Sequence, residues 1–314
     1  MDQPRVTTAN FVRAETNRMF ATLSGVTGGL STFMHTRRPT AIDQQNVIRM
    51  NRDTLYSIAI CDLDGDVSIT LPDARGRYLS LMVLDQDHYV GALLHDAGTH
   101  VLNPADFGSR YVALVVRILV DPTDTDDLAQ VNALQDEVLL ECGATGTFEA
   151  PRYDKESFKA VRQAVLELAK WTPGFEGGFG RRGEVDPVQH LIGTAAGWGG
   201  LPPAEATYLG VNPQMPVGHY ILEVPRGVPV DAFWSISVYN EAGFFEQNDL
   251  EQYSVNSVTA TQEADGTTVV HLGGPGDLPN SIWLPEGWNY VVRLYRPHPE
   301  ILDGSWRFPR FRQA

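Results

Sequence analysis

A chain of 314 residues is longer than one small hydrophobic core usually serves, so its length favours two structural units. Hydrophobic residues make up 43% and charged residues 20%, as in an ordinary soluble globular protein. The formal net charge is -15, and such a negative field repels nucleic-acid phosphates and anionic membrane surfaces. We therefore expect a small molecule as substrate or ligand, and neither nucleic acid nor membrane as a partner.

The N-terminal residues and the cysteines bear on location. Met1 to Arg5 leads into a polar segment without the apolar core of a secretion signal, and no run of about 18 apolar residues would span a bilayer. Cys61 and Cys142 each lie in an apolar stretch, which is typical of buried free thiols in a reducing compartment. These features predict a cytoplasmic protein without a disulfide.

The first predicted element is a helix over residues 9–26 that ends at Gly28-Gly29. Its apolar face comprises Val12, Met19, Leu23 and Val26. Glu15 and Arg18 are left for solvent.

Strand patterns follow. Residues 67–71 alternate apolar and polar side chains with period two, and Pro72 closes the run. Residues 78–84 form a second predicted strand. Residues 111–120 are a long β-branched run, which is typical of a strand buried on both faces.

Helical patterns return in the middle of the chain. Asp126 places acid in the first turn of one predicted helix, and another begins near Asp154. Residues 172–186 are rich in glycine, proline and charge and indicate a loop, after which Pro187 suits the first turn of a short helix. From Tyr220 onward strands and turns dominate again.

Two strand-rich parts of the sequence look alike. Aligning Ser80 with Ser235 matches an aromatic residue, the strand alternation and a terminal Asp or Asn. Arg117 and Arg293 form a second, weaker pair. An internal duplication explains these matches, and it predicts two similar antiparallel β units.

The predicted fold class is therefore mainly β with helical insertions (α+β), built from two jelly-roll-like antiparallel β-sandwich units. Residues 1–125 would hold the N-terminal helix and the first β unit. Residues 126–210 would form a helical connecting region, and residues 211–314 the second β unit.

Several motifs together resemble a known pair of domains. The first group is Asn51-Arg52-Asp53-Thr54-Leu55-Tyr56, Leu71-Pro72 to Tyr78, and Gly199-Gly200-Leu201-Pro202-Pro203. The second group is Phe233-Trp234-Ser235, Tyr239-Asn240, Asn248, Tyr253-Ser254, Trp283-Leu284-Pro285 and Ile301-Leu302-Asp303-Gly304-Ser305-Trp306. The first group resembles the bacterial domain of unknown function DUF1254, and the second resembles its usual partner, DUF1214.

This resemblance spans nearly the whole chain and implies a pair of β-sandwich units with helical insertions in a homo-oligomer. It implies little about chemistry. The chain departs from the pattern at Asp87-His88-Tyr89, and we expect it to differ from the many members that carry a secretion signal.

Standard catalytic signatures for serine hydrolases, zinc proteases and P-loop enzymes are missing. The segment Gly178-Phe179-Gly180-Arg181-Arg182-Gly183 has the spacing of a dinucleotide fingerprint, but it follows a predicted loop rather than a strand. We therefore predict no redox cofactor and interpret the segment as a flexible loop with two arginines.

The histidines leave two possibilities open. His88, His95 and His100 lie near Asp85, Asp87 and Asp96, and imidazole with carboxylate suits zinc or iron. His88 and His95 would face opposite sides of one strand, which argues against that site, so no metal ligands are assigned. His190, on the helix after Pro187, is either a packing residue or a general base.

The strongest candidate site combines residues from both halves of the chain. Asp53 is the candidate base, Arg52 the group that stabilises negative charge, and Tyr56 the third catalytic candidate. The predicted substrate-binding residues are Asn51, Tyr239, Asn248, Tyr253, Trp283 and His190. Packing of the aromatic residues in the two cores is the alternative interpretation.

We accordingly predict a small-molecule enzyme that uses acid–base chemistry without a redox cofactor, in a pocket between the two β units. Hydrolysis, lyase action and isomerisation all stay open. The alternatives are a non-catalytic small-ligand-binding protein, a metal-dependent enzyme and a purely structural role.

Overall fold

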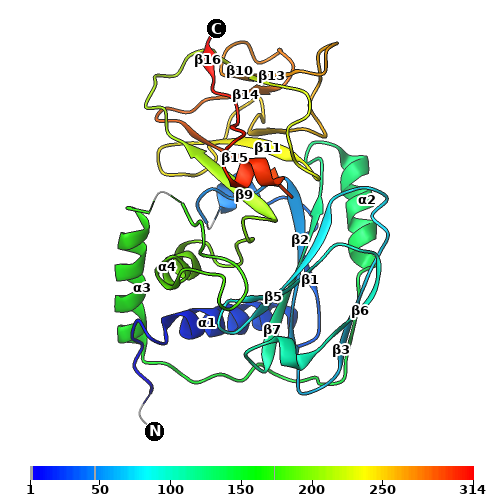
Figure 1. Cartoon of the computed structure of the whole chain (residues 1–314), viewed down its shortest axis with the longest axis vertical. Helices are drawn as coiled ribbons and strands as arrows, with labels where there is room; N and C mark the ends of the chain where they lie inside the picture. The colour runs from blue at the N-terminus through cyan, green and yellow to red at the C-terminus, as the bar shows by residue number, and fades with distance from the viewer. Residues whose placement is uncertain (1–2, 46, 173) are drawn as a thin grey trace. The chain divides into compact units, whose positions relative to one another are not determined.

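The computed structural model describes residues 3–45, 47–172 and 174–314. It divides the chain into two compact units (Figure 1). Unit 1 comprises Met1–Arg38 and Thr54–Pro202, and unit 2 comprises Pro39–Asp53 and Pro203–Ala314. Strands dominate over helices and pair antiparallel, apart from the parallel pair β13–β14, so the predicted mainly-β class with helical insertions is confirmed.

The strands of unit 1 form two sheets, with the orders β1-β2-β7-β4-β5 and β6-β3-β8. They are β1 (Met34–His35), β2 (Thr54–Asp62), β3 (Val67–Leu71), β4 (Leu79–Asp85), β5 (Val90–Leu94), β6 (Gly98–Leu102), β7 (Tyr111–Leu119) and β8 (Leu139–Cys142). The helices are α1 (Phe11–Thr27), α2 (Thr125–Asp136), α3 (Lys155–Ala169) and α4 (Pro187–Ala196), with a 3-10 turn at Pro104–Asp106.

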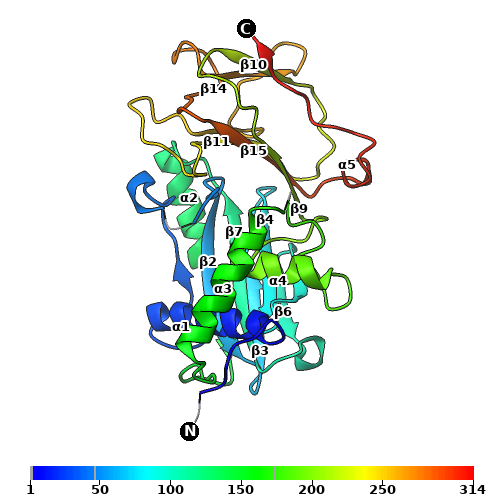
Figure 2. The same ribbon diagram turned by 90° about the vertical axis from the view of Figure 1, so that its left-hand side faces the viewer.

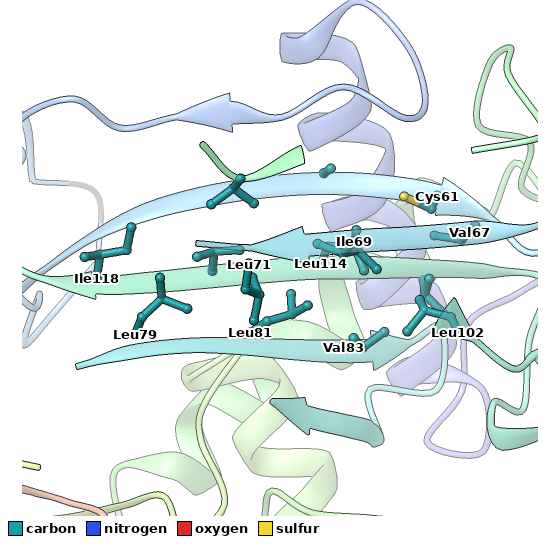
Figure 3. Packing of buried hydrophobic residues seen from close by; sticks show 14 of the residues in the cluster. Cys61, Val67, Ile69, Leu71, Leu79, Leu81, Val83, Leu102, Leu114 and Ile118 are labelled. Carbon is teal, nitrogen blue, oxygen red and sulfur yellow. The ribbon is translucent and has the colours of Figure 1, made fainter. Parts of the chain in front are cut away.

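The core of unit 1 lies between its two sheets. Alternate residues of β2, β3, β4 and β7 meet there, as Figure 3 shows for Ile69, Leu81 and Leu114. Helices α1, α3 and α4 lie on the other face of the five-stranded sheet (Figures 1 and 2). Both faces of β7 are therefore covered, and every residue of Tyr111–Leu119 is buried, as its continuous apolar run predicted.

Side-chain caps fix the helix starts that the sequence predicted. Asp154 accepts a hydrogen bond from the Ser157 amide, and Asp186 accepts from the amides that follow Pro187. Helix α1 ends at Gly28, whose φ of 78° is the left-handed conformation that glycine adopts without a steric cost.

The predicted solvent face of α1 was right for Arg18, whose side chain is 43% exposed, and wrong for Glu15. Val26 is 64% exposed, whereas Glu15 is 1% exposed and pairs with Arg18 and Arg162. Contacts with α3 and α4 bury Phe11, Ala14 and Glu15 instead, and Phe20 packs against Phe148 and Trp198. The packing of neighbouring helices therefore determines which face of α1 is buried. The Glu15 carboxylate can be buried there because it is paired with arginine.

Unit 2 also contains two sheets, with the orders β9-β15-β11-β12 and β14-β13-β10-β16. Its strands are β9 (Ala206–Val211), β10 (Tyr220–Val224), β11 (Trp234–Tyr239), β12 (Ser254–Asn256), β13 (Thr268–Leu272), β14 (Ser281–Ile282), β15 (Asn289–Tyr295) and β16 (Arg312–Gln313). A 3-10 turn, η1, spans Ile42–Gln44, and a short helix, α5, spans Pro299–Leu302. The two sheets share a core rich in aliphatic and aromatic residues.

The strand orders of the two units correspond. The order β2-β7-β4-β5 matches β9-β15-β11-β12, and β6-β3-β8 matches β13-β10-β16. The registers match as well. Arg117 lies between the cross-strand partners Tyr56 and Ser80, and Arg293 lies between Tyr208 and Ser235. This correspondence supports the internal duplication that Ser80 and Ser235 suggested.

No helix within the described part of the chain has both the length and the hydrophobicity needed to cross a membrane.

Candidate functional site

In unit 2 the polar candidates gather on the sheet face that points away from the core. On β11, Trp234, Ile236 and Val238 point into the core, so Ser235, Ser237 and Tyr239 lie on the opposite face. Arg293 lies on that face of the neighbouring strand, β15, directly across from Ser235. Segment 39–53 of the same unit supplies the backbone carbonyls that cover this face.

Arg293 is the centre of this network and is only 3% exposed. Its Nη1 donates to Ser237 Oγ at 2.9 Å. Its Nη2 donates to the Tyr239 hydroxyl at 2.7 Å and to the carbonyls of Arg49 and Met50 at 2.9 and 3.3 Å. Tyr239 in turn donates to Met50 O at 2.8 Å. The guanidinium therefore ties two strands to the covering segment through charge-assisted hydrogen bonds.

Asp53 is the buried acid of the network and is 1% exposed. It accepts a hydrogen bond from Ser235 Oγ at 2.6 Å, and the Asn256 side chain also hydrogen-bonds to it. Burial raises the pKa of Asp53, and the attraction of Arg293 offsets only part of this effect. Burial by itself lowers the pKa of Arg293, but Tyr239 and Asp53 outweigh it and raise the pKa, so Arg293 stays cationic.

Arg52 lies nearer the surface and stacks on aromatic rings. Its guanidinium carbon is 5.3 Å from the Tyr253 ring centroid and 5.9 Å from that of Phe245. Burial lowers the pKa of Arg52 without removing its charge. Among the described residues its guanidinium donates one hydrogen bond, to Thr40 O at 2.9 Å, and no carboxylate lies within ion-pair distance. The remaining N–H donors suit a small oxyanion.

The structure brings together five of the nine predicted site residues, namely Asn51, Arg52, Asp53, Tyr239 and Tyr253. Asn51 Oδ1 accepts the Asp53 amide at 2.8 Å, and its Nδ2 donates to the Tyr295 hydroxyl at 2.9 Å. These bonds orient Asp53 toward Ser235.

The other four residues lie elsewhere. Asn248 accepts the amides of Leu250 and Gln252 and so organises its own loop, while Trp283 is half-buried near Gln252. Tyr56 and His190 belong to unit 1. Tyr56 contacts Arg117, and the guanidinium carbon of Arg117 is 5.3 Å from the centroid of the Tyr56 ring.

Sequence reasoning missed Arg293, Ser235 and Ser237 as members of the site. The signal was present in the repeated pairs Arg117 with Arg293 and Ser80 with Ser235, which were used only as evidence of duplication. These pairs are polar residues at equal strand positions of the two repeats, on the sheet face away from the core. That pattern could have indicated that they belong to a site.

In unit 1, His190 belongs to a second polar cluster at the end of β4. Its Nδ1 lies 2.8 Å from Gly178 O, and its Nε2 lies 2.9 Å from Asp87 O. Both partners are backbone carbonyl oxygens, which accept hydrogen bonds. The Tyr89 ring stacks on it with centroids 4.6 Å apart, and the Arg182 guanidinium lies 4.4 Å from the Tyr89 centroid.

His88 lies beside His190 in this cluster, with the ring centroids 5.7 Å apart. Its Nε2 accepts the Gly199 amide at 2.8 Å, and its Nδ1 lies 3.0 Å from Thr194 Oγ1. Burial, reinforced by His190, lowers the pKa of His88 to about 3. Its φ of 63° is unusual for a residue other than glycine. The Asp87-His88-Tyr89 departure is therefore a turn in which His88 is buried and hydrogen-bonded, with Asp87 and Tyr89 half-buried.

The Gly-rich segment covers this turn. Gly180 O accepts the Val90 amide at 2.9 Å, and Arg182 pairs with Asp87 at 2.8 Å. The segment lies in a loop after α3 rather than after a strand, so it lacks the βαβ setting of a dinucleotide site.

The three neighbouring histidines do not converge. His88 bonds to Thr194 and Gly199, whereas His95 lies 2.9 Å from Leu79 O and His100 lies 2.8 Å from Asp96 O. Across residues 3–45, 47–172 and 174–314, no group of three histidine, cysteine or acidic side chains is arranged to hold a metal ion.

Comparison with known families confirms the predicted resemblance. Residues 30–94 match the family described as "Protein of unknown function (DUF1254)", and residues 212–299 match "Protein of unknown function (DUF1214)". The first match includes Asn51–Asp53 and the second includes Tyr239, Tyr253 and Arg293. Together the two matches cover less of the chain than the resemblance implied. The motifs Gly199–Pro203 and Ile301–Trp306 lie outside them. No curated protein matches the chain.

Two solved structures share the fold. The VPA0106 protein from Vibrio parahaemolyticus is 18% identical, with a TM-score of 0.72 over 98% of this chain and 97% of its own. An uncharacterised protein from Burkholderia cenocepacia is 15% identical, with a TM-score of 0.53 over 96% of this chain and 86% of its own. At these identities the likeness concerns the fold alone.

Proposed function

We propose that this chain, which carries both the DUF1254 and the DUF1214 matches, is a small-molecule enzyme that uses acid–base chemistry without a redox cofactor. Hydrolysis, lyase action and isomerisation are the reaction types that fit. One observation supports the proposal most directly. In unit 2, an incompletely hydrogen-bonded Arg52 adjoins a carboxyl group, Asp53, whose pKa burial raises.

Each residue has a defined role in this proposal. Arg52 holds an oxyanion of the substrate, and the Tyr253 and Phe245 rings form an apolar wall beside it. Asp53 transfers the proton, since a raised pKa brings a carboxyl group closer to neutral pH. Because Asp53 is 1% exposed, proton transfer to a substrate requires the groups packed around its carboxyl group to move aside.

The test is a thermal-shift screen of a metabolite panel, followed by mass spectrometry of every stabilising compound. Wild type is compared with Arg52→Lys and Asp53→Asn, and Asp249→Asn, an exposed acid of the same unit, is the control. We expect the screen to find a carboxylate or a phosphate ester that both wild type and the control convert. Asp53→Asn should bind this compound without converting it. Arg52→Lys should bind it about tenfold more weakly than wild type does, or more weakly still. Undiminished conversion by Asp53→Asn would remove that residue from the mechanism.

A second candidate is a non-catalytic binding protein, and a pocket in unit 2 favours it. The pocket has a volume of about 210 Å³, with Trp234, Arg226, Ser257 and Gln262 among its lining residues. Trp234 points to the core side of β11, away from the Asp53 face, so a ligand there would not approach the acid. Stabilisation by a ligand that is never converted, and that is lost in Arg226→Gln, would favour this function.

We also propose that both units are jelly-roll-like β-sandwiches and that the protein is a cytoplasmic homo-oligomer. The paired sheets with a shared core in each unit support the architecture. Light scattering coupled to size-exclusion chromatography tests the oligomer, and a single-chain mass would contradict it.

A further inference from the structure

The two cysteines of unit 1 approach each other from different sheets. Cys61 lies near the end of β2 and points into the core, where Figure 3 shows its sulfur at the edge of the apolar cluster. Cys142 is the last residue of β8, the edge strand of the three-stranded sheet. Both thiols are free, and their Sγ atoms are 3.6 Å apart.

The two thiols differ in access and in acidity. Cys61 is fully buried, whereas Cys142 is partly exposed on its edge strand. The hydrogen bond with Cys61, helped by one from Ser31, lowers the pKa of Cys142 to about 7. The same contact and burial raise the pKa of Cys61. The accessible sulfur is therefore the more nucleophilic one near neutral pH.

We propose that Cys142 is a redox modification site, and that its reaction with a low-molecular-weight disulfide such as glutathione disulfide ends in a Cys61–Cys142 disulfide across the two sheets.

The reaction has two steps. The Cys142 thiolate attacks one sulfur of glutathione disulfide, forms a mixed disulfide and releases one glutathione thiolate. The Cys61 thiol then gives up its proton and attacks the Cys142 sulfur, which releases the second glutathione. Two protein thiols are oxidised, and one glutathione disulfide is reduced to two glutathione thiols.

The geometry suits the second step. A disulfide has a sulfur–sulfur bond of about 2.05 Å, so the sulfurs must approach by roughly 1.5 Å. Rotation of the partly exposed Cys142 side chain supplies movement on this scale. Cys61 on β2 is the cross-strand partner of Val112 on β7, and Cys142 on β8 is the cross-strand partner of Val67 on β3. The bond would therefore link the five-stranded sheet to the three-stranded one and close a long loop, which restricts the unfolded chain.

The experiment uses the full chain incubated with glutathione disulfide, followed by acid quenching, alkylation of free thiols and peptide mass spectrometry. For wild type we expect a transient glutathione adduct on Cys142 and then a cross-linked peptide containing both cysteines. In Cys61→Ala the adduct on Cys142 should persist. In Cys142→Ala, Cys61 should stay unmodified. The oxidised wild type should melt roughly 5 °C or more above the reduced form, and dithiothreitol should reverse the shift.

Three results would overturn the proposal. The first is wild type in which both thiols stay fully alkylated, and the second is a stable Cys142 adduct that never resolves. The third is initial modification of Cys61. Circular dichroism shows whether each variant is folded. If either is not, the order in which the adduct and the cross-link appear in the wild-type time course tests the proposal by itself.

Discussion

The two units place an arginine at the same position of matching sheets, but different chain segments cover it. In unit 1, Arg117 donates to Gly199 O at 2.6 Å and its guanidinium lies beside the Tyr56 ring. In unit 2, Arg293 bonds to Tyr239 and to backbone carbonyls of segment 39–53, beside the buried Asp53. The comparison teaches that the strand framework places the cation, whereas the covering segment supplies the chemistry around it.

His88 of unit 1 and Asp53 of unit 2 are both buried, and burial disfavours a positive charge on the first and a negative charge on the second. Burial lowers the pKa of His88 and raises the pKa of Asp53, as it also raises the pKa of Asp85 in unit 1. Acid should therefore weaken the first network, and base should weaken the second. The following experiments break or sharpen this contrast.

The largest effect is expected for Arg293→Met. The substitution keeps side-chain volume but removes the cation beside Asp53, and breaking a buried charged network of this kind costs about 3–5 kcal/mol. Urea unfolding followed by tryptophan fluorescence measures the loss. Arg312→Met, which breaks an exposed pair with Glu223 in the same unit, is the control and should cost about 1 kcal/mol or less. Equal losses in the two variants would contradict a central role for Arg293.

His88 should give unit 1 an acid-sensitive stability. In the unfolded chain its pKa is near 6.5, and in the folded chain it is about 3, so the unfolded state binds more protons between these values. Stability from His88 is then complete above pH 6.5 and falls as the pH drops, by roughly 3 kcal/mol at pH 4.

Urea unfolding of wild type and His88→Asn from pH 4 to 7 isolates this contribution, with hydrogen exchange of unit 1 peptides as the local readout. Asparagine tolerates the positive φ at this position. A difference between the two proteins that does not change with pH would show that His88 does not titrate in this way.

Ser235→Ala and Ser80→Ala compare equivalent positions directly. Ser235 donates to the Asp53 carboxyl group at 2.6 Å, whereas Ser80 accepts from the Tyr78 hydroxyl at 3.0 Å. A hydrogen bond to a charged group contributes more, so we expect losses of about 1.5–3 kcal/mol for Ser235→Ala and about 0.5–1.5 kcal/mol for Ser80→Ala. Chemical denaturation of both variants ranks them, and the reverse order would mean that Asp53 does not depend on Ser235.

The last comparison concerns the pH dependence of Asp53, whose pKa burial raises while Arg293 offsets part of this effect. Its folded pKa is raised above the ordinary value near 3.8, so the folded state binds more protons just above that value. The stability of wild type relative to Asp53→Asn should therefore fall as the pH rises from 4 and then level off. Paired urea titrations from pH 4 to 8 test the sign, and a relative stability that rises with pH would contradict a raised pKa.

Much of the local structure followed from sequence patterns. Asp154, Pro187 and Gly28 marked helix ends, because the residues that start or stop a helix act on neighbouring backbone groups. The continuous apolar run from Tyr111 marked a strand covered on both faces. The exposed face of α1 could not be predicted, because the packing of α3 and α4 against it decides which stripe is buried.

The candidate site was predicted in part. The residue types of Asn51–Asp53 indicated a polar cluster, and the structure does bring them near Tyr239 and Tyr253. It also shows that Arg293 is the centre of the network, and that Asp53 is buried against Ser235 and Asn256. Nothing local to either residue signals this arrangement, since they are 240 positions apart in the chain.

By itself the sequence determined the elements, their caps, the duplicated strand pattern and the resemblance to the DUF1254–DUF1214 pair. These depend on side-chain period and on contacts between near neighbours. Only the tertiary structure decided that Arg293 meets segment 39–53, that His88 is held neutral, and that Cys61 faces Cys142. Each of these depends on which distant segments exclude water from a given side chain, and burial of that kind is a property of the folded chain as a whole.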